Sequence, residues 1–333
     1  MSSNPFTSSI FENSWTNYYN KHKKTQSLNF IEGVKFTKSS YFPLYINLGK
    51  NFTNGISYSI NNEASDYKGK VVLLYDVPSY FQLNNAHHSN IVLKKVRQYN
   101  GFYADLKAFN GIDDVLNANF NSSKSRYNFR RSLKQLDENY NISYKVYFGN
   151  ISKENYAKEM KTFRELISKR FDEKNTFNTV LPMWDFYEEL IYPLILDKKV
   201  VLNVIYNDEQ PIAMSINFLY NDALMVSIRT FDVDFNKMNI GNIEIYKLIE
   251  WCLENKVNIL DFSKGENYYK KRWTSTEYFY DHHIIYDKKS PIAVILANGV
   301  IYHFKFKQFL RDKNVNSLYT KLKYLPKRLF SKK

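Results

Sequence analysis

Hydrophobic and polar positions follow the clearest pattern in the second half of the chain. Three apolar runs of strand length are separated there by short polar turns: 200–206 ("VVLNVIY"), 211–220 ("PIAMSINFLY") and 223–231 ("ALMVSIRTF"). Such runs predict three strands joined by hairpins. Apolar residues then recur at helical spacing over 241–255, and a short apolar strand covers 258–262. The predicted order is β-β-β-α-β, in which the helix crosses over to a parallel strand.

The residues before this region predict further helices and one strand. Residues 122–136 ("SSKSRYNFRRSLKQL") begin with serines and carry apolar residues on one side, which predicts a helix. Residues 142–148 alternate like a strand, and helices are predicted at 153–171 and 182–197.

The N-terminal third predicts a smaller β-α-β unit. Residues 70–77 and 102–107 have the composition of strands, and a helix is predicted near 88–98 between them. The Asn-rich stretches 47–62 and 84–90 are predicted to be loops. Because no low-complexity linker separates the two halves, we expect them to pack closely.

Composition narrows the class of protein. The 333 residues are 44% hydrophobic and 17% aromatic, which is typical of a packed globular protein. No apolar run reaches the roughly 18 residues of a transmembrane helix. The start, "MSSNPFTSSIFENSW", lacks a basic segment followed by an apolar one, so we expect no secretory signal and a cytoplasmic protein. Cys252 is the single cysteine, and four of the six histidines form adjacent pairs, a spacing that disfavours a metal site.

The net charge of +14 is concentrated at the C-terminus. Residues 301–333 contain ten Lys or Arg against the single acid Asp312, a local charge of +9. Four leucines lie there at helical spacing, although Pro326 interrupts the last turn: Leu318, Leu322, Leu325 and Leu329. This basic amphipathic segment suits peripheral contact with an anionic membrane, and the alternative is docking of its leucines onto the main body. Nucleic acid is not favoured, because no zinc-finger or RNP-type signature is present.

A candidate anion-binding turn precedes the helix at 241–255. In the turn 236–242 ("NKMNIGN"), Gly241 permits close approach to the backbone and Lys237 adds a positive charge. With Ile240 and Asn242 it places free backbone N–H groups at the positive end of a helix dipole, where a pyrophosphate binds favourably. The same residues also suit an ordinary loop with a helix cap.

The β-β-β-α-β order with an anion-binding turn after its third strand resembles the core of the GNAT N-acetyltransferase superfamily. In that fold the strands beside the helix part, and acyl-CoA enters the gap. Residues 261–273 ("DFSKGENYYKKRW") resemble the "DF…GDE-x-YK-x-RW" signature of CelD-like acetyltransferases. This GNAT branch occurs in cellulose and other surface-polysaccharide clusters and is related to FemAB-type peptidyltransferases. Residues 122–131 ("SSKSRYNFRR") resemble the "SSK-x-R-x-x-x-RR" segment of the same families, and the resemblance covers about 115–290.

Two positions depart from the family pattern. The usual Gly-Asp-Glu is Gly265-Glu266-Asn267 here. The phosphate loop Gln/Arg-x-x-Gly-x-Gly/Ala corresponds to 237–242, where neither glycine is in its expected place.

The resemblance implies an α/β fold of tandem GNAT-like lobes with mixed central sheets, the second lobe the better formed. We predict an N-terminal lobe over 1–120, a catalytic lobe over 121–290 and a basic amphipathic tail over 291–333.

The activity that the resemblance implies is transfer of an acyl group to an amino sugar or a sugar hydroxyl of a surface-polysaccharide precursor. The acyl group is acetyl from acetyl-CoA, and no metal takes part. The tail then holds the protein at the inner membrane face. Two alternatives remain: a FemAB-like transferase that uses aminoacyl-tRNA, and a non-catalytic relic that binds glycan.

Acyl transfer needs a base for the nucleophile's proton and a donor for the developing charge. By the resemblance, Asp261 and Glu266 are the candidate bases, and Tyr269 is the candidate donor to the thiolate or the thioester carbonyl. Lys270 completes the catalytic candidates and also suits an acidic substrate group.

Four further residues are candidate substrate contacts. Arg272 suits phosphates or an acidic sugar, Trp273 suits the wall of an acyl or sugar site, and Arg126 and Arg130 suit an acceptor cleft. Several of the catalytic and substrate candidates also have an ordinary structural explanation: Asp261 as the cap of a turn, Trp273 as a core residue, and Arg126 and Arg130 as part of a solvated helix face.

Overall fold

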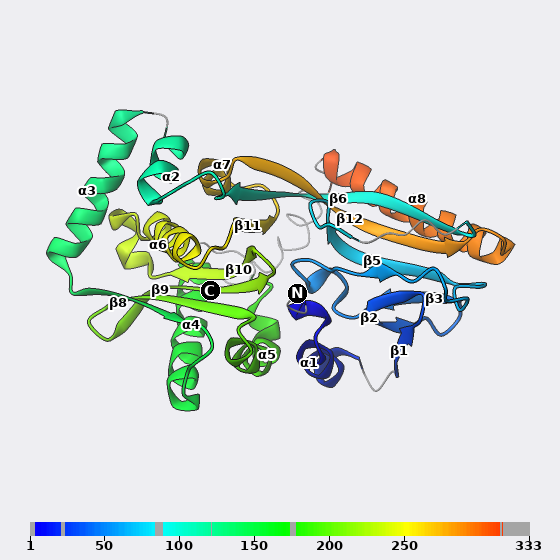
Figure 1. The fold of residues 1–333 in the computed structure, drawn as a ribbon. Coiled ribbons are helices and arrows are strands. Elements are labelled where there is room, and N and C mark those ends of the chain that lie inside the picture. The colour runs from blue at the N-terminus through cyan, green and yellow to red at the C-terminus, as the bar shows by residue number, and fades with distance from the viewer. Residues whose placement is uncertain are drawn as a thin grey trace, which may run out of the picture. The chain divides into compact units, whose positions relative to one another are not determined.

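The computed structural model describes residues 4–20, 24–83, 89–120, 122–173, 178–313 and 315 (Figure 1). They form two compact units that interleave along the chain. Unit 1 draws on the ranges 1–24, 52–56 and 100–278, and unit 2 on 25–51, 57–99 and 279–333. The expected α/β class with mixed sheets is confirmed. The two compact units are discontinuous in sequence. The continuous lobes over 1–120 and 121–290 stay a prediction.

Unit 1 is built on a mixed sheet with the strand order β6-β11-β10-β9-β8-β7. Its strands are β7 (Ile142–Tyr147), β8 (Val200–Asn207), β9 (Gln210–Tyr220), β10 (Ala223–Phe231), β11 (Ile259–Lys264) and the second half of β6 (Ile91–Asp105). Neighbours from β7 to β10 are antiparallel, β10 and β11 are parallel, and β11 and β6 are antiparallel. The β-β-β-α-β order predicted from the sequence is therefore confirmed.

Helices cover both faces of this sheet, which explains why β8 and β9 are buried along most of their length. The helices are α1 (Ser9–Tyr19), α2 (Ile112–Asn119), α3 (Ser123–Asn139), α4 (Lys153–Glu173), α5 (Trp184–Leu196), α6 (Ile240–Glu254) and α7 (Tyr268–Trp273), with 3-10 turns η1 (Pro5–Thr7), η3 (Leu181–Met183) and η4 (Val233–Met238). α2, α3 and α6 share one hydrophobic core with the sheet. α4 and α5 lie on the opposite face (Figure 1).

Unit 2 contains the strands β1-β2-β3-β5-β12 in that order, followed by the first half of β6. Its elements are β1 (Thr25–Leu28), β2 (Ile31–Lys38), β3 (Leu44–Asn47), β4 (Ser59–Ile60), β5 (Val71–Pro78), β12 (Thr276–Asp287) and α8 (Pro291–Asp312), and η2 (Lys50–Phe52) lies at its border with unit 1. β4 pairs with β2. α8 packs on β5 and β12 through a small hydrophobic core.

The helix predicted near 88–98 is wrong, because residues 91–105 form the single long strand β6. Exposure alternates there with a period of two: Lys95 and Arg97 are exposed, whereas Val96 and Gln98 are buried. Buried positions two residues apart mark one face of a strand, whereas a helix would bury positions three or four apart. Of the predicted loops, 47–62 is mostly irregular, and 84–88 lies outside the described residues.

Much of the predicted tail lies outside the described residues, including the four leucines from Leu318 to Leu329 and Pro326. The part that is described, α8, is an ordinary helix of unit 2 that begins with the cap Ser290. Among the described residues, no helix combines the length and the apolar character needed to cross a bilayer.

Candidate active site

β10 and β11 part within the sheet of unit 1. They pair only from Ala223 and Ile259 to Met225 and Asp261. Beyond that point β10 stays paired with β9 as far as Phe231, whereas the register of β11 on β6 shifts after Asp261. The shift has a local cause, because Ser263 adopts a left-handed backbone conformation with φ +59°. The splayed strand pair that the GNAT resemblance implies is therefore present.

Asn54 bridges the parted strands. Its Nδ2 donates to Ser263 Oγ at 2.8 Å, and its Oδ1 accepts from Ser227 Oγ at 3.0 Å. The Ser263 hydroxyl donates in turn to the carbonyl of Val226 at 2.9 Å, and Lys264 Nζ donates to the carbonyl of Thr53 at 2.7 Å. A short segment from the N-terminal part of the chain therefore occupies the gap in which the resemblance places an acyl group.

Asp261 lies at the parting point and is fully buried. The hydroxyl of Tyr278 lies 2.6 Å from its Oδ2 and 2.8 Å from its Oδ1, and donates to this carboxylate. The Ser263 N–H donates to Oδ1 at 2.7 Å. These contacts include the turn cap considered above for Asp261, and they fix the carboxylate in one orientation.

Lys270 extends from α7 toward the same place and is buried, with 6% of its surface exposed. Its Nζ donates to the carbonyls of Lys264 at 2.7 Å and Ser263 at 3.4 Å. The pKa of Lys270 is lowered to about 8, chiefly by burial; the nearby Asp261 opposes the shift and Arg229 adds to it. A neutral amine has two N–H donors, which match these two carbonyls and leave its lone pair available.

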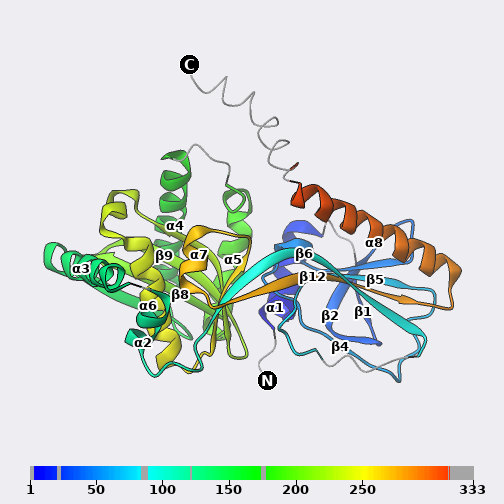
Figure 2. The same cartoon turned by 90° about the horizontal axis from the view of Figure 1, so that it is seen from above.

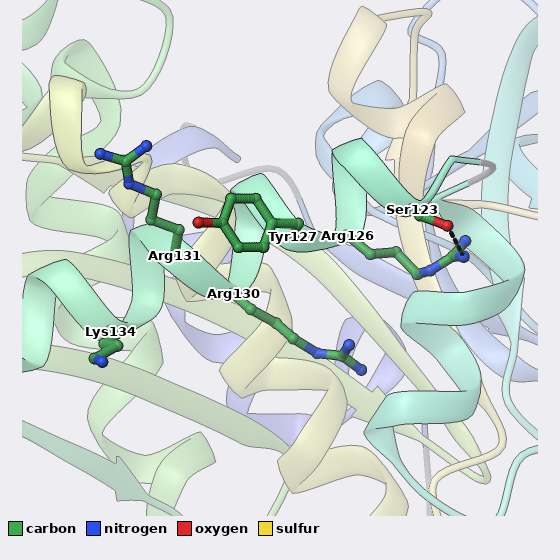
Figure 3. A pocket seen from close by; sticks show the side chains of 6 residues that line it. All are labelled: Ser123, Arg126, Tyr127, Arg130, Arg131 and Lys134. Atoms are coloured by element: carbon green, nitrogen blue, oxygen red, sulfur yellow. Dashed lines mark hydrogen bonds between the residues drawn. The ribbon is translucent and has the colours of Figure 1, made fainter.

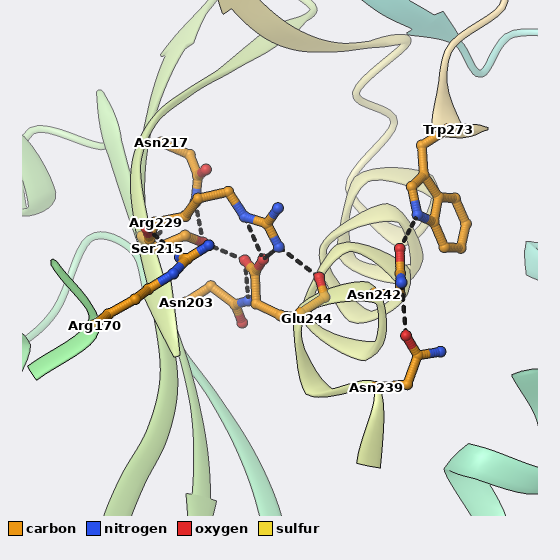
Figure 4. A network of polar contacts seen from close by, with 10 residues as sticks. Arg170, Asn203, Ser215, Asn217, Arg229, Asn239, Asn242, Glu244 and Trp273 are labelled. Atoms are coloured by element: carbon orange, nitrogen blue, oxygen red, sulfur yellow. Dashed lines mark hydrogen bonds and ion pairs between the residues drawn. The ribbon is translucent and has the colours of Figure 1, made fainter. Parts of the chain in front are cut away.

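Tyr269, the neighbour of Lys270, packs against Arg229. Arg229 belongs to a buried polar network that Figure 4 shows. The Arg229 guanidinium lies 4.9 Å from the centre of the Tyr269 ring. Arg229 Nη2 pairs with Glu244 Oε2 at 2.6 Å, and the Glu244 residue is only 1% exposed. Ser215 Oγ donates to the other oxygen of Glu244 at 2.6 Å. Burial alone lowers the pKa of Arg229, but the contact with Glu244 outweighs it and the net pKa is raised.

The four residues predicted to bind an anion lie at or just before the start of α6, and their surroundings differ. Ile240 is fully buried in the core, and Lys237 is exposed. The Gly241 carbonyl accepts from Arg229 Nη2 at 2.5 Å. Asn242 accepts at its Oδ1 from the Trp273 indole N–H at 2.9 Å, as Figure 4 shows. This turn is thus braced by side chains on two sides, whereas its lysine is exposed.

Glycine is required at position 241 because the Phe231 ring approaches the backbone closely there. A Cβ at position 241 would lie 2.8 Å from Cε1 of the Phe231 ring, which is itself stacked under Arg170 at 4.1 Å. We expect Gly241→Ala to lower the free energy of unfolding by about 1–3 kcal/mol. Gly299→Ala, at a helical glycine with open space around its Cβ, is the matched control and is expected to stabilise by up to about 1 kcal/mol. Denaturant unfolding measures both, and equal stability of the two variants would contradict this packing account.

Trp273 is fully buried and packs edge-on against the Phe120 ring at 5.2 Å and the Phe129 ring at 5.8 Å. It is a core residue of unit 1 whose indole N–H fixes Asn242. Arg272 lies beside it, 5.5 Å from the centre of the Phe120 ring, and donates to the Tyr268 hydroxyl at 3.2 Å.

Glu266 lies apart from this cluster. Its side chain is 57% exposed and forms an ion pair with Lys271, also at the surface. The structure therefore brings together Asp261, Tyr269 and Lys270 of the predicted catalytic residues and leaves Glu266 outside.

Arg126 and Arg130 lie together on an exposed face of α3 (Figure 3). This α3 surface borders a hollow of about 520 Å³ and consists of Ser123, Arg126, Tyr127, Arg130, Arg131 and Lys134. Arg126 Nη1 donates to the carbonyl of Phe120 at 2.6 Å, and Arg130 pairs with Asp113 at 2.7 Å. The Tyr127 side chain is exposed beside them. Exposed cations around an aromatic ring suit a phosphate-rich or acidic ligand.

Sequence reasoning missed Asn54, Arg229, Glu244 and Tyr278. A signal was present for Glu244, because it falls one turn from Leu248 on the apolar face of the predicted helix 241–255. A signal was also present for Arg229, because it is a charged residue inside the otherwise apolar run 223–231. No local signal existed for Asn54, which lies about 170 residues from Ser227 in sequence.

Residues 123–271 match the family model described as an acetyltransferase (GNAT) domain. No curated protein sequence matches the chain. A solved structure titled as FemX matches with a TM-score of 0.53 and 10% identity, over 79% of this chain and 86% of that one.

Two further solved structures match less well. A conserved protein from Bacteroides thetaiotaomicron has a TM-score of 0.49 and 12% identity, over 86% of this chain and 92% of that one. The C-terminal domain of a lysylphosphatidylglycerol synthetase from Agrobacterium fabrum has a TM-score of 0.47 and 10% identity, over 84% and 88%. The family match and the parted strands β10 and β11 agree: residues 123–271 match a GNAT acetyltransferase domain and contain the parted strands, and the chain shares its fold with the FemX structure.

Proposed function

We propose that the chain is an acyltransferase that takes an acetyl group from acetyl-CoA. The parting of β10 and β11 supports this proposal most strongly, because it brings buried polar groups to the place where the fold admits an acyl donor. In the proposed complex the pyrophosphate lies at the first turn of α6, near Lys237, and the thioester lies between Ser227 and Ser263. Asn54 moves out of the gap or contributes its amide to the thioester oxygen.

Lys270 is the proposed general base. At its pKa of about 8 a substantial fraction is neutral near physiological pH, so it can take the proton of an attacking amine or hydroxyl. The nucleophile adds to the thioester carbon, the tetrahedral intermediate collapses, and the thiolate leaves with a proton from the Tyr269 hydroxyl. Asp261 takes no proton in this scheme, because its oxygens accept hydrogen bonds from Tyr278 and the Ser263 N–H. Its charge stabilises the ammonium formed on Lys270. Glu266 takes no step.

The proposed acceptor is an amino sugar or a sugar hydroxyl of a surface-polysaccharide precursor. The motif at 261–273 supports this choice through its resemblance to CelD-like acetyltransferases. The α3 surface suits acidic or phosphorylated parts of such a precursor, and α3 lies beside η4, the turn that precedes α6.

Calorimetric titration with acetyl-CoA tests the donor. We expect micromolar binding by the full chain and a loss of at least about tenfold in Lys237→Glu, which sets a negative charge beside the pyrophosphate. Lys158→Glu on the exposed side of α4 is the matched control, with the same change in net charge, and should bind like the wild type. Absence of heat with any acyl-CoA would contradict the acyl-CoA proposal.

A transferase that uses aminoacyl-tRNA is the second candidate. Two observations favour it: the shared fold with FemX and the exposed cations and Tyr127 of the α3 surface. If tRNA is the donor, its affinity falls steeply with salt, and Arg131→Glu with Lys134→Glu weakens it strongly. If neither acetyl-CoA nor tRNA binds, the remaining proposal is a glycan-binding relic of the fold.

A further inference from the structure

α8 has apolar residues on two opposite sides. One side packs on unit 2, where Ala293, Ala297, Ile301 and Phe304 are buried against β5 and β12. The other side faces solvent. Figure 2 shows α8 as an unbroken helix lying along the strands of unit 2.

The solvent side carries a continuous row of large apolar side chains, here called the α8 stripe. Its members are Ile292, Ile295, Tyr302, Phe306 and Phe309, each between 55% and 73% exposed. They repeat at intervals of three and four residues, with Gly299 in the one open position, so they lie on a single face of the helix. The stripe is roughly 25 Å long at 1.5 Å per residue. Exposed rows of this size mark interaction surfaces.

Positive charges flank the α8 stripe at both ends. Lys288 and Lys289 are exposed just before the helix, and Lys305 and Lys307 are exposed beside its aromatic residues. The only acid in the helix, Asp312, accepts a hydrogen bond from Gln308. The sequence then continues over 316–333 with six Lys or Arg and no acid. The described surroundings of the stripe are therefore cationic, and the sequence that follows adds further positive charge.

We propose that the α8 stripe docks on the surface of an anionic lipid bilayer. In this arrangement α8 lies parallel to the membrane plane, its isoleucines and aromatic rings enter the headgroup and upper acyl region, and the flanking lysines contact lipid phosphates. Tyr302 at the centre has the amphipathic ring typical of that interface. The surface does not depend on the proposed acyl transfer, and its residues differ from the leucines of the predicted tail.

Charge distinguishes this occupant from a second copy of the chain. If two α8 stripes packed together, in either orientation, the basic ends of both helices would come close and repel one another. An anionic bilayer neutralises the same charges, so apolar burial and electrostatics act in one direction.

Flotation of the full chain with lipid vesicles tests the proposal. The test variant is Tyr302→Ser with Phe306→Ser. The matched control is Tyr41→Ser with Phe42→Ser, which removes the same two side chains from exposed positions elsewhere in unit 2. We expect the wild type and the control to bind vesicles containing anionic phosphatidylglycerol, and the test variant to bind at least about tenfold more weakly. Vesicles of neutral phosphatidylcholine alone should bind the wild type much less.

Three outcomes would overturn the proposal. The first is absence of wild-type binding to anionic vesicles. The second is equal binding by the test variant, which would assign binding to the basic sequence after residue 315. The third is a wild-type dimer in sedimentation that the test variant disrupts, without vesicle binding, which would assign the stripe to a second copy of the chain.

Discussion

Lys270→Met is expected to reduce acetyl transfer by about a thousandfold, because the reaction loses its general base. Lys270→Arg should fail to a similar degree although it keeps the positive charge, since a guanidinium stays protonated at any pH of interest. Initial rates of thiol release from acetyl-CoA, measured with a panel of amino-sugar acceptors, report this step. In the wild type the rate should rise with pH and level off above an apparent pKa of about 8.

The adjacent Lys271 supplies the control for this prediction. Its side chain is exposed and pairs only with Glu266 among the contacts described for it, so Lys271→Met should retain the wild-type rate and pH profile. A Lys270→Met enzyme with an unchanged rate, or a pH profile that is flat between 6 and 9 in the wild type, would remove Lys270 from the mechanism.

The lowered pKa of Lys270 also has a thermodynamic consequence. Between its folded pKa of about 8 and its ordinary value of 10.5, the unfolded chain holds a proton that the folded chain does not. The free energy of unfolding therefore rises with pH across this window, by an amount on the order of 3 kcal/mol. The difference in stability between the wild type and Lys270→Met isolates this rise from the titration of other groups, because the variant lacks it.

Arg229→Met is expected to cause the largest loss of stability, about 3–5 kcal/mol, because it leaves the buried carboxylate of Glu244 without its cation. Glu244 is 1% exposed and keeps the Ser215 hydroxyl as a hydrogen-bond donor in the variant. Arg170 still attracts the charge of Glu244, but no ion pair between the two is among the described contacts. The Gly241 carbonyl at the start of α6 also loses a donor. Denaturant unfolding should show this loss as a lower midpoint with an unchanged slope.

A double-mutant cycle separates the ion pair from the packing around it. Arg229→Met combined with Glu244→Met replaces both charges by flexible apolar side chains, and we expect it to be more stable than Arg229→Met alone. Lys169→Met is the matched single change at a partly exposed ion pair, with Asp232 and Asp234, and should cost less than about 1 kcal/mol. A loss of similar size in Arg229→Met and Lys169→Met would contradict the account of the buried network.

The sequence was sufficient to predict the strands and the helix of unit 1. Strands β8 to β11 and α6 begin and end within about two residues of the predicted bounds, because long apolar runs and short polar turns leave few alternatives there. The prediction failed at β6, where a short mixed run over 91–98 fits either period. Burial alternates over 95–98 because α8 covers one side of the strand there, where Val96 and Gln98 are buried.

The site was predictable in part. The motif at 261–273 identified Asp261, Tyr269 and Lys270, which the structure brings together beside the parted strands. The "YK-x-RW" pattern includes Lys270 and not Lys271, and in the structure Lys270 is buried whereas Lys271 is exposed. Trp273 and Ile240 are core residues, which only the packing of α3 and α6 reveals. Asn54 and Tyr278 reach the site through the tertiary fold, so their roles cannot be derived from local sequence.

We propose that an acyl donor binds where β10 and β11 part. Hydrogen–deuterium exchange of the full chain, with and without acetyl-CoA, tests it most directly. We expect acetyl-CoA to slow exchange in 237–243 at the start of α6 and in the parted ends of the strands, 226–231 and 261–264, with little change on α8. Exchange that acetyl-CoA leaves unaltered in all three segments, while tRNA slows it along the α3 surface, would contradict the claim and favour the tRNA-dependent reaction.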